Sequence, residues 1–114
     1  GMNLVIHEFA HKIDMRDGSA NGCPPLPPGM APNVWQRTMQ RAFADFSRKV
    51  ERDARTAIDP YAAESPAEFF AVLSEVFFVE PALLRHEYAD VYALFARFYR
   101  QDPAARTALL RDDV

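Results

Sequence analysis

The stretch VIHEFAHKID, residues 5–14, is the most informative part of this sequence because it places two histidines four positions apart. On an α-helix, residues four apart lie on one face about one turn from each other, so His7 and His11 can direct their imidazoles at one ion. Glu8 lies between them, with a carboxylate that projects beside such an ion rather than onto it. The stretch therefore predicts a helix over residues 3–15 that carries a metal site.

Zinc is the metal that this arrangement favours. Neutral imidazole nitrogens bind zinc at roughly 2.0–2.1 Å, and two histidines one turn apart supply two corners of a tetrahedron. A neighbouring carboxylate can take a proton from a zinc-bound water, which is the role we predict for Glu8. This HExxH pattern is typical of zinc peptidases, and a chance match on a core helix is expected in well under ~1% of chains this short.

Length and composition indicate one small folded domain, residues 1–114. About half of the residues are hydrophobic (49%) and the formal net charge is −3, so neither direct nucleic-acid binding nor membrane binding is indicated. We find no apolar run of 18 residues and no charged leader, and therefore expect a soluble, cytoplasmic protein. The single cysteine, Cys23, excludes an internal disulfide.

The rest of the chain predicts only helices. A proline-rich loop through residue 32 precedes a long amphipathic helix that Asn33 is expected to cap. Ser65 and Pro66 start SPAEFFAVLSEVFF, a helix that is apolar nearly all round and so central to the core. Shorter helices are expected to begin at Pro81, near Ala89, and at Asp102 with Pro103. We predict an all-α fold of five or six helices.

Two histidines and a water leave zinc one protein ligand short. Glu68 and Glu75 are seven residues apart, so they share one face of an apolar helix, where carboxylates are costly unless paired or metal-bound. Glu68 has an alternative role, because Ser65-Pro-Ala-Glu68 also fits a capping box. Spacing alone leaves both roles of Glu68 open. The other downstream donors of suitable chemistry are Asp59, Glu64, Glu80 and His86.

Three ordered strings, HEFAHKIDMRDG (7–18), IDPYAAESPAEFFAVLSEVFF (58–78) and FYRQDP (98–103), resemble the C-terminal half of the MtfA (Mlc titration factor) family of zinc peptidases, relatives of the lethal-factor-like zincins. The resemblance covers most of the chain. It implies that the Glu of PAEFF, Glu68, is the third zinc ligand beside His7 and His11, with Glu8 as general base. It also implies that Tyr61 lies near the metal and hydrogen-bonds the developing oxyanion.

Two further carboxylates are predicted to lie next to the metal ligands without binding the metal themselves. Asp14 lies three residues after His11 on the same helical face, so it can orient a ligand imidazole through its second nitrogen. The alternative is that Asp14 bonds the loop that follows the helix. Glu75 is the second carboxylate to which we assign a supporting role.

The resemblance implies a cytoplasmic, zinc-dependent peptidase of aminopeptidase type, with a peptide substrate and an Mlc-like transcriptional repressor as a partner. Family members also carry a part ahead of the motif helix, including a sheet whose edge strand holds the substrate by β-augmentation. This chain lacks that part, so we expect weak or no peptidase activity from it alone. The alternatives are a catalytically inactive zinc-binding fragment that acts as a partner-binding or regulatory module, and a structural helical domain without metal.

Exposed apolar surface predicts self-association. The apolar residues of the motif helix lie on more than one of its faces, and the helix containing FFAVLSEVFF is apolar almost all round. Five or six short helices are expected to leave part of this surface uncovered. We therefore predict a two-fold symmetric homodimer with a largely hydrophobic interface.

Overall fold

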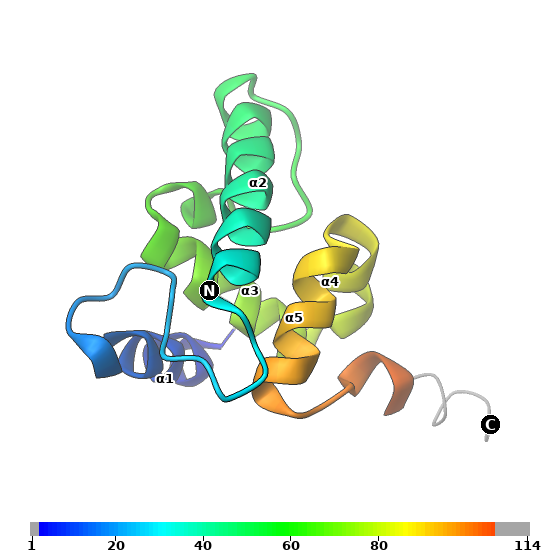
Figure 1. The fold of residues 1–114 in the computed structure, drawn as a ribbon. Coiled ribbons are helices and arrows are strands. Elements are labelled where there is room, and N and C mark those ends of the chain that lie inside the picture. The colour runs from blue at the N-terminus through cyan, green and yellow to red at the C-terminus, as the bar shows by residue number, and fades with distance from the viewer. Residues whose placement is uncertain (1–2, 107–114) are drawn as a thin grey trace.

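The computed structural model describes residues 3–106, and every regular element in that range is helical (Figure 1). No strand occurs among residues 3–106, so the predicted all-α class is confirmed. A short helical turn at 103–106 follows the last long helix. In chain order, the elements are α1 (Leu4–Asp14), the 3-10 helix η1 (Met15–Asp17), α2 (Pro32–Glu51), the 3-10 helix η2 (Pro60–Ala63), α3 (Pro66–Val79), α4 (Pro81–Glu87) and α5 (Ala89–Tyr99).

Helix α3 is the centre of the fold. Its residues are buried without interruption from Phe69 to Phe77, with α1 packed against one side of it and α4 against another (Figure 1). Trp35 of α2 stacks on Phe95 of α5 with ring centroids 5.6 Å apart, and both rings contact Phe70 of α3. Full burial of one large apolar side chain stabilises a fold by about 1.5–3 kcal/mol, so this aromatic cluster is a major source of stability.

The helix starts follow local signals in the sequence, with one correction. Ser65 caps α3 as predicted, since its hydroxyl accepts a hydrogen bond from the Glu68 amide at 3.1 Å. The prediction that Asn33 caps α2 is wrong, because α2 begins at Pro32 with Ala31 in the cap position. Proline has its φ preset for the first helical position, and this preference places Asn33 inside the first turn.

Exposed apolar side chains gather on α1 and not on the middle of α3. Leu4, Val5 and Phe9 are 69%, 79% and 63% exposed, whereas residues 69–77 are covered by the rest of the chain. The predicted excess of apolar surface is therefore concentrated on α1, where the three most exposed large apolar side chains among the described residues lie. The homodimer stays a prediction, and α1 is where its interface is expected.

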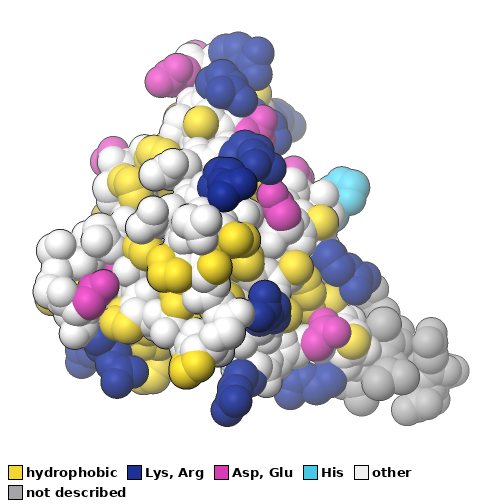
Figure 2. Space-filling view, in the orientation of Figure 1, with side chains coloured by type: hydrophobic (Ala, Val, Ile, Leu, Met, Phe, Trp, Pro, Cys, Tyr) yellow, Lys and Arg dark blue, Asp and Glu magenta, His cyan; other side chains and the backbone are white. Residues whose placement is uncertain are grey.

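Helix α2 carries its basic residues on the solvent side, as its sequence pattern predicts. Arg37, Arg41 and Arg48 are exposed, and Lys and Arg side chains lie along this helix in Figure 2. Lys49 pairs with Asp45 one turn earlier at 3.2 Å. No helix within residues 3–106 combines the length and the apolar character needed to cross a membrane.

Candidate metal centre

Two helices bring three potential metal ligands together. Helix α1 contributes His7 and His11, whose ring centroids are 4.8 Å apart, and α3 contributes Glu68. His7 Nε2 lies 3.3 Å from Glu68 Oε1, and His11 Nε2 contacts the same carboxylate oxygen. One ligand atom from each side chain lies within 4.8 Å of the others. Among residues 3–106, no other group of His, Cys, Asp and Glu side chains forms such a cluster.

The donor chemistry of this cluster fits zinc, and the pair of His7 and Glu68 has the separation that two zinc ligands require. Two ligands bound at roughly 2.0–2.1 Å in a tetrahedron lie about 3.3 Å from each other, which is the separation found between His7 Nε2 and Glu68 Oε1. Two imidazoles and one carboxylate are also the donor set of a catalytic zinc site that keeps its fourth position open. The three side chains are only partly exposed, which limits the conformations that they can adopt.

Glu68 makes only half of the predicted capping box. Its backbone amide donates to Ser65, but its carboxylate turns to the two histidines instead of back to the Ser65 amide. Burial alone would raise the pKa of the Glu68 carboxyl, but a hydrogen bond from the Tyr61 hydroxyl and the nearby His11 outweigh it and hold that pKa below its ordinary value. The carboxylate is therefore ionised at neutral pH, as a metal ligand must be.

Glu75 lies directly behind His7. Its side chain is 1% exposed, one oxygen accepts a hydrogen bond from His7 Nδ1, and the other accepts from the Asn3 amide at 3.1 Å. A hydrogen bond at Nδ1 fixes the imidazole tautomer, so that the Nε2 lone pair is directed toward Glu68 and His11. Glu75 is thus positioned to orient His7 and to increase its basicity.

Glu75→Gln is expected to weaken zinc binding by about 10-fold, because changes behind a metal ligand cost about 10–100-fold and glutamine retains one acceptor for His7. The zinc dissociation constant, measured by competition with a chromophoric chelator, tests this. The loss should be smaller than that of Glu68→Gln. The opposite order would identify Glu75 as the third ligand.

A cleft of about 330 Å³ opens over the cluster. Glu8 is exposed at this cleft, and half-exposed Tyr61 has its ring centroid 6.2 Å from that of His7. The hydrogen bond to Glu68 raises the pKa of the Tyr61 hydroxyl above its ordinary value, so the hydroxyl is protonated at neutral pH and can donate. Leu4, Asp59 and Val72 complete the walls of this cleft with the residues already described.

Asp14 bonds the loop after α1, which is one of the two roles predicted for it. Its side chain is fully buried, and Oδ2 accepts a hydrogen bond from the Gly22 amide at 2.7 Å. The only hydrogen bond of the His11 side chain within residues 3–106 goes to Glu68. Burial raises the pKa of the Asp14 carboxyl above its ordinary value, although the backbone hydrogen bonds oppose this shift.

The other candidate ligands do not belong to the cluster. Asp59 lines the cleft but accepts a hydrogen bond from the Tyr61 amide at 3.0 Å, as the cap of η2. The remaining three are exposed and lie outside the cluster: Glu64, Glu80 and His86.

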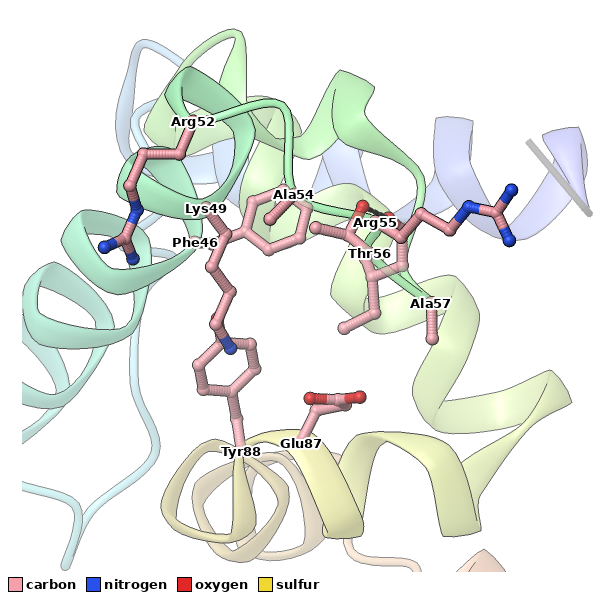
Figure 3. A pocket seen from close by; sticks show the side chains of 10 residues that line it. Phe46, Lys49, Arg52, Ala54, Arg55, Thr56, Ala57, Glu87 and Tyr88 are labelled. Carbon is pink, nitrogen blue, oxygen red and sulfur yellow. Dashed lines mark hydrogen bonds between the residues drawn. The ribbon is translucent and has the colours of Figure 1, made fainter.

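A second hollow, of about 320 Å³, lies between the end of α2 and the start of α5 (Figure 3). Lys49 extends toward the ring of Tyr88, with Nζ 5.4 Å from its centroid, whereas Arg52 and Arg55 extend away from the hollow (Figure 3). Asp45 accepts a hydrogen bond from the Tyr88 hydroxyl at 2.9 Å and pairs with Lys49, so these polar groups satisfy one another. Glu87 is the carboxylate that lines this hollow, and it is not part of a cluster of metal ligands among residues 3–106.

Asn3 is the site residue that the sequence pattern did not single out. Its side chain caps α1 by accepting from the Ile6 amide at 3.1 Å, while its own amide donates to Glu75. An asparagine immediately before an apolar-periodic run is a known cap signal, so the first role was detectable. The second role depends on the approach of α3 and has no local signal.

Comparisons with known proteins agree with this geometry. Residues 1–100 match the family described as glucose-regulated metallo-peptidase M90. The chain is 47% identical over 109 residues to proteins named Mlc titration factor A from Edwardsiella ictaluri (strain 93-146) and Yersinia pestis (strain Pestoides F). These alignments cover 93% of this chain but only 41% and 40% of the two relatives. With a family match that covers most of its length and an HExxH helix at a three-ligand cluster, this chain belongs to the glucose-regulated metallo-peptidase M90 family.

Proposed function

We propose that this chain carries the catalytic zinc site of a peptidase of aminopeptidase type. The observation that supports the proposal best is the convergence of His7 and His11 with Glu68, from elements 57 residues apart, at one half-open cleft. Capping alone would not require the Glu68 carboxylate to face two imidazoles. Family membership supports the same reaction class.

His7, His11 and Glu68 would hold the zinc ion. When bound there, zinc supplies Lewis-acid chemistry, polarising a peptide carbonyl and lowering the pKa of water. Glu8, exposed at the cleft, accepts the proton of the attacking water on its carboxylate and delivers it to the leaving amine. The Tyr61 hydroxyl, which donates its one proton to Glu68 in the structure, would turn that proton to the oxyanion that develops on the carbonyl oxygen.

Substitution of the general base tests this function. Glu8→Gln is expected to lower the turnover of a chromogenic aminoacyl substrate by about 10²–10⁴-fold, because the amide cannot take the proton. The zinc content should stay at one ion per chain, since Glu8 is not a ligand. Glu51→Gln, an exposed carboxylate at the end of α2, is the matched control and should be as active as the unmodified chain. If the unmodified chain shows measurable turnover and Glu8→Gln leaves it unchanged, the proposed role of Glu8 is contradicted.

One observation favours a second candidate function, a zinc-binding helical module that acts by docking on a partner. The exposed apolar residues Leu4, Val5 and Phe9 lie on the helix that carries the motif, and Leu4 also lines the cleft. Such a module would bind zinc without measurable turnover. The relatives are named for titrating Mlc, and we propose a repressor of that type as the partner class.

A further inference from the structure

The loop after α1 returns to the metal centre through Gly22. This residue is buried although Asn21 before it is exposed. Its amide donates to Asp14 Oδ2 at 2.7 Å, and its carbonyl accepts from Trp35 Nε1 at 3.0 Å. Asp14 and Trp35 are themselves buried, so both hydrogen bonds are shielded from water and hold the loop in one place.

Gly22 also lies directly against the first residue of α3. A Cβ atom added to Gly22 would lie 2.6 Å from the backbone oxygen of Pro66 and 3.0 Å from its carbonyl carbon. The backbone of Gly22 has φ of +82°, a region that other residues rarely adopt. Glycine is therefore required here twice, for its conformation and for its lack of a side chain.

The two contacts of Gly22 lie beside metal ligands on different helices. Asp14 is three residues after His11 on the same face of α1, and Pro66 is two residues before Glu68 in the first turn of α3. One loop residue thus spans the gap between the helices that supply nitrogen and oxygen ligands. Any movement of Pro66 away from Gly22 moves the first turn of α3, and Glu68 with it.

The movement of Pro66 that a side chain at position 22 would require is large compared with the tolerance of metal–ligand distances. Real Cβ atoms essentially never approach another heavy atom closer than 3.0 Å, so the 2.6 Å contact with a backbone oxygen must open before a side chain is accepted. Metal–ligand distances are defined to within about 0.2 Å. The displacement of Pro66 would exceed this tolerance.

We propose that Gly22 is a positioning residue of the metal centre: bonded to Asp14 and packed on Pro66, it sets the separation between the histidines of α1 and Glu68 of α3. The inference rests on the proposed zinc site. It assigns a role to Asp14 as well, since Asp14 acts on the site through the loop backbone and not through an imidazole.

Gly22→Ala tests the proposal, with Gly29→Ala as its control. Gly29 has a similar φ of +92°, but a Cβ there meets nothing within 4 Å, so the control carries the backbone strain without the collision. Gly22→Ala is expected to weaken zinc binding by about 10–100-fold, the usual effect of disturbing a ligand's support. It should also change the visible absorption spectrum of the Co²⁺-substituted protein. Gly29→Ala should stay within about 3-fold of the unmodified chain, as surface substitutions usually do.

A second pair of variants tests the other contact of Gly22. Asp14→Asn keeps an oxygen that accepts from the Gly22 amide and should retain zinc affinity and the Co²⁺ spectrum. Asp14→Ala removes the acceptor and should weaken zinc binding by about 10-fold. Circular dichroism of the metal-free variants establishes whether each variant is folded. If Gly22→Ala does not fold, the two Asp14 variants test the proposal by themselves.

Two results would overturn the inference. If Asp14→Ala, and Gly22→Ala where it folds, bind zinc with unchanged affinity and an unchanged Co²⁺ spectrum, Gly22 does not position the ligands, and the zinc site itself is unaffected. If the unmodified chain binds no zinc, the proposed function fails and the inference fails with it. The unmodified chain therefore distinguishes the two failures.

Discussion

Replacing His7 and His11 together by alanine is expected to abolish stoichiometric zinc binding. Each imidazole presents Nε2 to the same carboxylate oxygen of Glu68, so the double variant leaves one carboxylate to hold the ion. A single carboxylate does not make a zinc site, because such sites use at least three protein ligands. The zinc content after metal loading and gel filtration, expressed per chain, is the measurement.

The third histidine of the chain provides the control for this experiment. His86 is exposed on α4 and lies outside the cluster, so His86→Ala should retain one zinc per chain. His11→Ala is the cleaner single variant, because His7→Ala also deprives buried Glu75 of its partner, which costs about 1–3 kcal/mol of folding stability. Stoichiometric zinc in the double variant would refute the motif interpretation.

Glu68→Gln is expected to weaken zinc binding by more than about 100-fold, beyond the range seen for groups behind the ligands. The reason is that a neutral amide replaces the only anionic ligand of the cluster. Chelator competition measures the zinc dissociation constant, and urea denaturation of the metal-free protein measures the free energy of unfolding. Loss of a zinc ligand changes mainly the dissociation constant, whereas loss of a helix cap changes mainly the free energy of unfolding, so the two measurements distinguish these roles.

Ser65→Ala is the matched variant for the capping role. It removes the hydroxyl that accepts from the Glu68 amide and should cost about 0.5–2 kcal/mol of the free energy of unfolding. Zinc affinity should be retained, because the Glu68 carboxylate does not depend on that hydroxyl. If Glu68→Gln lowered only the stability, as Ser65→Ala does, Glu68 would be a cap and not a ligand.

The predictable part of this fold is local. His7 and His11 meet because they are four residues apart on one helix. Helices α3 and α4 begin at Pro66 and Pro81, and Ser65 caps α3. The wrong assignment of Asn33 has a local cause too, since Pro32 competes for the first helical position. Such signals act over three or four residues and can be found in the sequence.

The part that was not predictable depends on how distant segments approach each other. Spacing could not decide between the two roles of Glu68, because the choice depends on whether α1 lies against its turn of α3. Within the sequence, only the resemblance to a known family favours the ligand role. The contact of Gly22 with Asp14 and Pro66 had no sequence signal beyond a glycine in a loop. The burial of α3 beneath aromatic side chains of other helices likewise depends on how distant segments pack together.

Helix α1 lies at the edge of the fold, and this position affects the stability of the metal centre differently from the stability of the core. Helix α1 packs chiefly against α3 and exposes its outward face, whereas α3 is enclosed on all sides over nine residues. Native proteins open in cooperative units, and the units with the fewest buried contacts open at the lowest free energy. Detachment of α1 would separate His7 and His11 from Glu68. An ion that joins His7 and His11 of α1 to Glu68 of α3 would therefore raise the free energy needed to open that contact.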